Sequence, residues 1–186
     1  MANSNDPFVL DVKELRRRAR ENMEKGAVTK GYGADLETTL KLLNDALATE
    51  IVCWLRYTFH AVSAQGIASE SVKAEFSTHA AEELEHAQWL AERINQLNGK
   101  PNMNPEGLHT RSHSQYVEGT SLVDMIRENL IAERIAIESY TEMIRYFGDK
   151  DVTSRRLIEK ILEKEEEHAN DMNDLLSAHD PEPRKA

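Results

Sequence analysis

The chain has 186 residues, and its 33 acidic and 23 basic side chains give it a formal net charge of −10 at pH 7. This length fits one domain with a sizeable core, while the negative charge argues against general binding to nucleic acid, which requires cationic side chains to neutralise phosphates. No apolar run approaches the roughly 20 residues of a membrane-spanning helix, so we expect no membrane partner.

The cysteine content and the N-terminus bear on the cellular compartment. Cys53 is the only cysteine, so no internal disulfide can form. The N-terminus lacks the apolar core of a secretory signal. We therefore expect a cytoplasmic protein in which Cys53 packs as a small core residue rather than acting as a nucleophile.

The first predicted helix is short and basic. Asp11 and Glu14 form a pattern typical of a capping pair, and Gly26 can close the helix. Its clustered basic residues are Arg16, Arg17, Arg18 and Arg20. Acidic residues dilute this patch, so we expect the helix to cover a subunit surface rather than bind DNA. We assign residues 1–34 to an N-terminal extension.

Four long helices are predicted next, because glycine and proline are scarce and cluster between them. Their expected ranges are 35–64, 69–98, 121–147 and 151–178. A connection rich in Asn, Pro, Gly, Ser and His covers residues 99–119. No segment alternates with the period of a β-strand. The sequence therefore predicts an all-α protein, with an antiparallel four-helix bundle over residues 35–178 and a flexible tail at 179–186.

Each long helix carries an apolar stripe at alternating steps of three and four residues. Four glutamates and two histidines also fall on these stripes, near the middle of the helices: Glu50, Glu83, His86, Glu133, Glu165 and His168. A carboxylate buried without counter-charge costs several kcal/mol, and no lysine or arginine lies on the stripes. Two divalent cations would balance the four carboxylates and engage both imidazoles.

The six residues form an internal duplication, Glu followed by Glu-x-x-His, twice. Glu50 precedes Glu83 by 33 residues, and Glu133 precedes Glu165 by 32 residues. Either Glu-x-x-His alone, in so acidic a run, is explained as well by a solvated helix face, but the shared register favours metal binding. One Glu from each of two helices and Glu-x-x-His from the other two is the di-iron carboxylate arrangement. These ligands suit iron best, with manganese or zinc as substitutes.

At these motifs the chain resembles the bacterioferritins and related mini-ferritins, including the Dps-like cage proteins. The resemblance covers about residues 35–178 and rests on Leu-Asn-Asp-Ala-Leu at 43–47, on Tyr57, and on the duplicated motif. It implies a ferritin-like fold and an intrasubunit centre with two irons per subunit that oxidises Fe(II) with dioxygen or hydrogen peroxide. It also implies a homo-oligomeric cage that stores ferric mineral and so limits oxidative stress.

The resemblance also implies a role for each residue of the duplication. Glu50 and Glu133 would be terminal ligands, and Glu83 and Glu165 would bridge the two irons. His86 and His168 would supply one imidazole to each iron.

Two departures from bacterioferritin alter what the resemblance implies. Leu84 occupies the position at which the family's haem-binding methionine is expected, so we expect no haem. After residue 178 the chain is too short and too rich in proline for the fifth helix of 24-subunit shells. We therefore expect a twelve-subunit shell, with the 24-subunit shell as the alternative.

Two tyrosines and three histidines also have an expected position relative to the centre. Tyr57 and Tyr140 follow Glu50 and Glu133 by seven residues, close enough to bond a ligand or to donate an electron, although both can also be core tyrosines. We expect His79 to pack beside the ligands rather than bind metal. The histidines expected to be exposed in the long connection are His109 and His113.

Two other functions use similar features. A discrete di-metal oxidoreductase, such as a manganese catalase or a di-iron oxygenase, has a similar ligand set, but the short chain has no additional domain to form a substrate pocket. A DNA-protecting Dps-like shell is the second alternative, with iron chemistry secondary.

Overall fold

The computed structural model describes residues 9–66 and 69–180, and the helices within these ranges follow one another without strands. They are α1 (Val12–Arg18), the 3-10 helix η1 (Met23–Lys25), α2 (Leu36–Ser63), α3 (Ser69–Gln96), α4 (Leu108–Arg111), α5 (Leu122–Phe147) and α6 (Val152–His179). The predicted all-α class is confirmed. No helix of this described part is long and apolar enough to cross a membrane.

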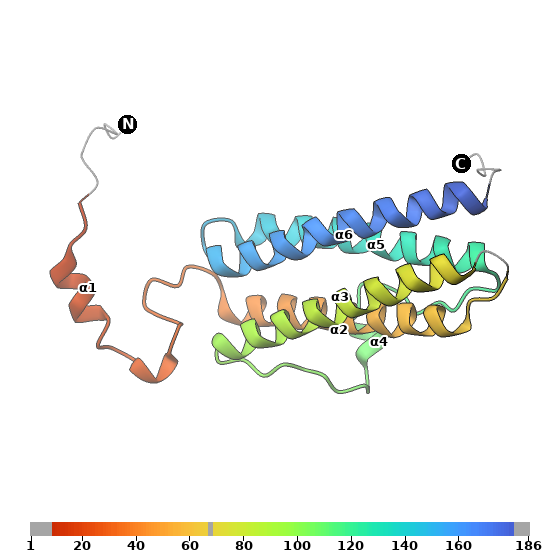
Figure 1. The fold of residues 1–186 in the computed structure, drawn as a ribbon. Helices are drawn as coiled ribbons and strands as arrows, with labels where there is room; N and C mark the ends of the chain where they lie inside the picture. Colours follow the sequence, from red (N-terminus) through yellow and green to blue (C-terminus); the bar gives the residue numbers. More distant parts are fainter. Residues whose placement is uncertain (1–8, 67–68, 181–186) are drawn as a thin grey trace.

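The four long helices form an elongated bundle (Figure 1). α2 packs mainly against α3, and α5 mainly against α6. Each of these pairs is antiparallel and joined by a short connection, while the segment between α3 and α5 crosses the length of the bundle (Figure 1). This segment contains the short helix α4, which packs against α2. The predicted four-helix bundle is confirmed.

The starts of three long helices follow from their capping residues. Asp35, Ser121 and Asp151 precede α2, α5 and α6, and each side chain accepts a hydrogen bond from the backbone N–H three residues later. Such caps satisfy donors that the first helical turn leaves unpaired. At the other end of α5, Gly148 has a φ of 44°, a conformation that favours glycine. These four residues set the helix boundaries close to the predicted ones.

The N-terminal extension differs from its prediction. α1 ends at Arg18 rather than continuing toward Gly26, and Asn22 with a φ of 53° separates it from η1. α1 contains no buried residue and stands apart from the bundle (Figure 1). The extension joins the bundle through Tyr32, whose hydroxyl donates to Asp151 Oδ2 at 2.9 Å. At the other end, α6 runs to His179, and residues 181–186 of the expected tail lie outside the described residues.

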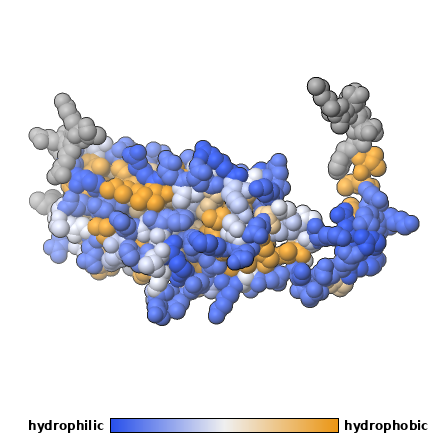
Figure 2. All heavy atoms as spheres, turned by 180° about the vertical axis from the view of Figure 1, so that it is seen from behind, coloured by the Kyte–Doolittle hydropathy of each residue, from blue (hydrophilic) through white to orange (hydrophobic). Residues whose placement is uncertain are grey.

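The core contains two large apolar clusters separated by polar side chains, and a small third one around Val52 and Leu108. One large cluster contains Leu43, Leu90 and Ile158, and the other contains Phe76 and Ile126. Hydrophilic residues dominate the face shown in Figure 2, with apolar patches between them. The polar middle of the bundle is where the duplicated motif lies.

Candidate metal centre

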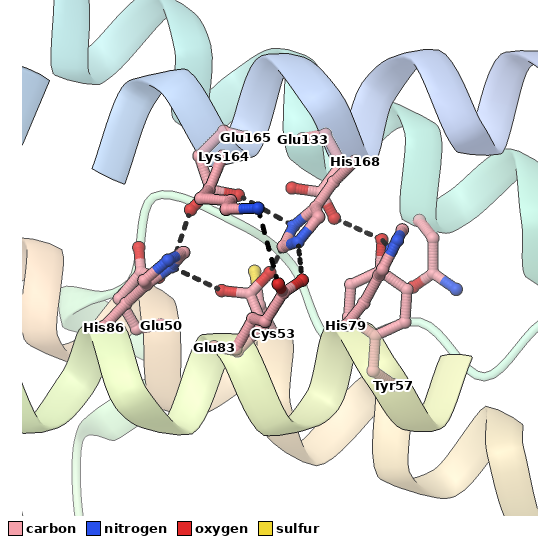
Figure 3. A network of polar contacts seen from close by, with 12 residues as sticks. Glu50, Cys53, Tyr57, His79, Glu83, His86, Glu133, Lys164, Glu165 and His168 are labelled. Carbon is pink, nitrogen blue, oxygen red and sulfur yellow. Dashed lines mark hydrogen bonds and ion pairs between the residues drawn. The ribbon is translucent and has the colours of Figure 1, made fainter. Parts of the chain in front are cut away.

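All four long helices contribute to one buried group of acidic and imidazole side chains (Figure 3). The contributors are Glu50 from α2, Glu83 and His86 from α3, Glu133 from α5, and Glu165 and His168 from α6. None of these side chains is more than 1% exposed. The structure thus brings together all six residues that the sequence singled out.

The six side chains form two overlapping groups. Glu50 and His86 belong to one group and Glu133 and His168 to the other, while Glu83 and Glu165 belong to both. Within each group the potential ligand atoms lie within 4.8 Å of one another. This arrangement suits two metal ions that share two carboxylates.

Both imidazoles direct Nδ1 toward the shared carboxylates. His86 Nδ1 lies 3.1 Å from Glu165 Oε1 and 3.1 Å from Glu50 Oε2. His168 Nδ1 lies 3.5 Å from Glu83 Oε1 and 3.5 Å from Glu165 Oε2. In both residues the same ring nitrogen is therefore placed to bind metal.

Glu82 orients the second imidazole from its outer side. Its Oε2 lies 2.7 Å from His168 Nε2. A carboxylate that accepts a hydrogen bond from one ring nitrogen fixes the tautomer and leaves the other nitrogen free for a metal. This role of Glu82 was not predicted from sequence, because Glu82 stands in a run of acidic residues that gives no local signal.

The centre also collects buried polar atoms that have no hydrogen-bond partner among the described residues. Six such atoms belong to it: both carboxylate oxygens of Glu83, both of Glu165, Glu133 Oε2 and His168 Nδ1. Buried polar groups are nearly always satisfied, and leaving one unpaired is costly. All six are potential metal ligands, so bound cations would satisfy them together.

Without metal, the two outer carboxyl groups favour their neutral form. Burial raises the pKa of Glu50 well above its ordinary value, and the negative charges of Glu165 and Glu83 raise it further. Burial likewise raises the pKa of Glu133, again with Glu83 and Glu165 adding to the effect. Desolvation and like charges thus act in the same direction at both residues.

The imidazoles favour their charged form. Burial opposes that charge, but contacts with Glu165, Glu50 and Glu83 outweigh it and raise the pKa of His86. Contacts with Glu165 and Glu83 similarly outweigh burial and raise the pKa of His168 to about 12. Burial alone would raise the pKa of Glu83, but its contacts with the imidazoles of His168 and His86 lower it instead. The metal-free centre thus balances two carboxylates against two imidazolium groups.

Two buried tyrosines hold the outer carboxyl groups. The Tyr57 hydroxyl donates to Glu133 Oε1, and the Tyr140 hydroxyl donates to Glu50 Oε1. Both tyrosines are fully buried. Each tyrosine follows one outer glutamate in the sequence by seven residues but contacts the other. This exchange reflects the packing of α2 against α5, which the spacing along a single helix could not show.

His79 lies beside the centre, next to Tyr57 and His168 (Figure 3). Its Nδ1 is 3.3 Å from the Tyr57 hydroxyl oxygen, and its ring stacks on that of His168 with 4.0 Å between centroids. It belongs to neither of the two overlapping groups.

A buried arginine near the centre was not predicted from sequence. Arg56 is fully buried, and its Nε donates to Asn129 Oδ1 at 2.8 Å. Its Nη1 donates to the carbonyl oxygen of Gln115 at 2.9 Å. These neutral acceptors hold the guanidinium away from direct contact with the carboxylates of the centre. Arg56 follows Leu55, which is 40% exposed, so apolar periodicity gave no indication of its burial.

The remaining predicted residues lie away from the centre, with one correction. His109 is exposed, but His113 is half-buried rather than exposed, and burial lowers its pKa. Cys53 is buried, and burial raises the pKa of its thiol well above the ordinary value, so it is a poor nucleophile. Leu84, at the expected haem position, is 38% exposed.

Comparison with known proteins places this arrangement in a family. The family described as "Ferritin-like domain" matches residues 40–179. The "DNA protection during starvation protein" of Pyrococcus furiosus is 30% identical over 148 residues, which cover 78% of this chain and 80% of that protein. The bacterioferritin of Desulfovibrio desulfuricans is 27% identical over 130 residues, which cover 69% of each chain.

A solved structure supports the same placement. The dodecameric thioferritin of Bacteroides fragilis, a bacterioferritin-related protein, is 32% identical to this chain and superposes with a TM-score of 0.75. The match covers 78% of this chain and 88% of that one. The chain therefore belongs to the ferritin-like family that includes the bacterioferritins and the Dps proteins.

Proposed function

We propose that this protein oxidises Fe(II) at the six-residue centre and stores the ferric product inside a homo-oligomeric cage. The observation that carries the proposal is the pair of overlapping groups, in which Glu83 and Glu165 are common to both. Two ions held by shared carboxylates are close enough to react with one oxidant molecule. Each Fe(II) gives one electron, so a pair reduces dioxygen to hydrogen peroxide, or hydrogen peroxide to water.

In this proposal the protein's own groups position the ions and control protons. Glu50 and Glu133 hold one ion each as terminal ligands, and Tyr140 and Tyr57 fix the orientation of those two carboxylates. Bound iron supplies the electrons, and manganese or zinc can occupy the same ligands without being the intended metal. The burial of every ligand keeps bulk water from the reacting pair.

The proposed cage is based on the assembly of a related protein. The Bacteroides fragilis thioferritin is dodecameric, and we propose the same twelve-subunit assembly here rather than a 24-subunit one. Apolar side chains exposed on the long helices, such as Leu55 and Ile131, offer area that neighbouring subunits can bury. We do not assign haem to the protein, because Leu84 replaces the expected methionine. We also propose that the protein is cytoplasmic.

One experiment tests assembly and chemistry together. Size-exclusion chromatography with light scattering gives the subunit number, and aerobic Fe(II) addition to the same peak gives the iron uptake. A particle of about twelve subunits that takes up many irons per subunit supports storage. A monomer or dimer that saturates at two irons supports the discrete di-metal enzyme instead.

Variants assign the oxidation to the centre. Glu83→Gln removes one shared carboxylate, and we expect it to abolish rapid oxidation. The matched control is Glu85→Gln, which changes an exposed glutamate on the same helix and should oxidise iron normally. Rapid oxidation by Glu83→Gln at the wild-type rate would show that the centre is elsewhere.

DNA protection stays the second candidate because the Pyrococcus furiosus relative carries that name. The net charge of −10 opposes it, since every subunit adds to the repulsion of phosphate. A gel-shift assay at increasing salt decides this point. Binding that weakens steeply with salt and is lost when the arginines of α1 are changed to glutamine supports DNA coating, and no shift at low salt excludes it.

A further inference from the structure

A third group of potential ligands lies beside the six-residue centre. Glu75 and His79 stand one turn apart on α3, and Asp171 approaches from α6. His79 Nε2 is 3.2 Å from Glu75 Oε1 and 3.4 Å from Asp171 Oδ2. One ligand atom from each of the three residues lies within 4.8 Å of the other two.

The group combines a buried imidazole with carboxylates that reach solvent. The His79 side chain is 2% exposed, whereas those of Glu75 and Asp171 are 39% and 42% exposed. Across the described residues, neither carboxylate forms an ion pair with a lysine or arginine. An ion arriving from solvent therefore meets two carboxylates that no lysine or arginine of the described residues neutralises, with a single imidazole beneath them.

The hydrogen bond between His79 and Tyr57 determines which ring nitrogen of His79 carries the hydrogen. The Tyr57 hydroxyl donates to Glu133 Oε1, so its hydrogen points away from His79. The hydroxyl oxygen must then accept the Nδ1–H of His79. His79 Nε2 is left with a lone pair that faces two carboxylates. A ring nitrogen that faces two carboxylate oxygens in this way forms a set of ligand atoms suited to a metal cation.

We propose that Glu75, His79 and Asp171 bind a divalent transition-metal cation at a third site, separate from the six-residue centre. One imidazole nitrogen and two carboxylate oxygens suit Fe(II), Mn(II) or Zn(II), with water completing the coordination. The loading role described next rests on the proposed function, but the geometry of the three ligands does not.

The position of the site gives it a role in loading the centre. The His79 ring stacks on that of His168, whose Nδ1 faces the shared carboxylates. The six ligands of the centre are at most 1% exposed, while the third site opens to solvent on the other side of this histidine pair. Fe(II) is captured at the third site and passes from His79 to the centre. The substrate of the third site is thus the metal ion itself.

Zinc titration and diffraction test the third site directly. We expect crystals soaked in Zn(II) to show three anomalous peaks per subunit, with one between His79 and Asp171. The double variant Glu75→Gln/Asp171→Asn should lose that peak and keep the other two. The matched control Glu85→Gln/Asp174→Asn changes exposed acids on the same two helices and should keep all three. A wild-type subunit without the third peak, or a double variant that retains it, overturns the proposal.

A second measurement separates this inference from the proposed function. In Glu83→Gln/Glu165→Gln, which disables the centre, the zinc peak at His79 should remain while the other two disappear. If wild-type protein fails to oxidise iron but shows the peak, the proposed function fails and the third site stands. For the loading role, Glu75→Gln/Asp171→Asn should raise the KM for Fe(II) about tenfold with little change in kcat. An unchanged KM would contradict that role.

Discussion

Metal binding at the six-residue centre should release about four protons, because protons occupy the centre when metal is absent. Raised pKa values favour the neutral form of Glu50 and Glu133 and the charged form of His86 and His168. Metal ligands must be deprotonated. Two ions therefore displace one proton from each of these four residues. A centre with ordinary pKa values would release fewer than about one proton in total at pH 7, because its carboxyl groups would already be ionised and its imidazoles mostly neutral.

The sign and size of the pH dependence follow from that count. The metal-free form gains stability from protons at every pH below the raised pKa values, so metal affinity falls as pH falls and rises as pH rises. With about four protons displaced, the combined binding constant for two ions changes about 10⁴-fold per pH unit, or about 5 kcal/mol at 1.36 kcal/mol per proton. This slope should hold wherever the pH lies below all four raised pKa values.

Calorimetry measures the proton count directly. Zn(II) is titrated at pH 7 into the Glu75→Gln/Asp171→Asn variant, which keeps only the centre, in PIPES and in HEPES. The difference in apparent binding enthalpy, divided by the difference in buffer ionisation enthalpy, gives the protons released. A release below about two protons would refute the charge assignment, even if two zinc ions bind.

Three further predictions concern stabilisation by zinc, the hydrogen bond of Tyr57 and the buried side chain of Arg56. Zn(II) at a hundredfold excess over its dissociation constant should stabilise the subunit by about 2.7 kcal/mol per site, or about 5 kcal/mol for the centre. Differential scanning calorimetry should then show a Tm about 10–20 °C higher, and Glu83→Gln/Glu165→Gln should lose this shift. Tyr57→Phe removes the hydrogen bond to Glu133 and should slow Fe(II) oxidation about tenfold in stopped-flow absorbance, without loss of helical circular dichroism. Arg56→Ala strands the buried acceptors of the guanidinium and should cost about 3 kcal/mol in urea unfolding, whereas the exposed Arg134→Ala should change stability by less than about 0.5 kcal/mol.

The sequence predicted the centre's six residues because each falls in register with apolar neighbours on its own helix. Glu50 illustrates this, since it continues the stripe that contains Leu43 and Leu47 and is buried as they are. Helix starts were equally local, because a cap such as Asp35 acts within three residues of itself. Properties that depend on one helix could therefore be predicted from one helix.

Contacts between helices could not be predicted from the periodicity of single helices. The approach of Asp171 to His79 depends on how α6 packs against α3, and no periodicity within either helix encodes it. The same applies to Arg56, whose burial depends on Asn129 arriving from α5. The helix predicted at α1 was too long. The capping pattern at Asp11 gave its start correctly, but α1 contains no buried residue whose packing could extend the helix beyond Arg18.

The charge balance of the metal-free centre also bears on when metal can enter. Four buried carboxylates without counter-charge would oppose folding. The protons on Glu50, Glu133, His86 and His168 supply the four positive charges that two divalent cations would otherwise bring. The bundle can therefore fold with a neutral centre and acquire its ions afterwards. Each ion must then enter by exchange with protons, and the proposed third site would hold the cation beside His168 while that exchange takes place, without exposing the buried carboxylates.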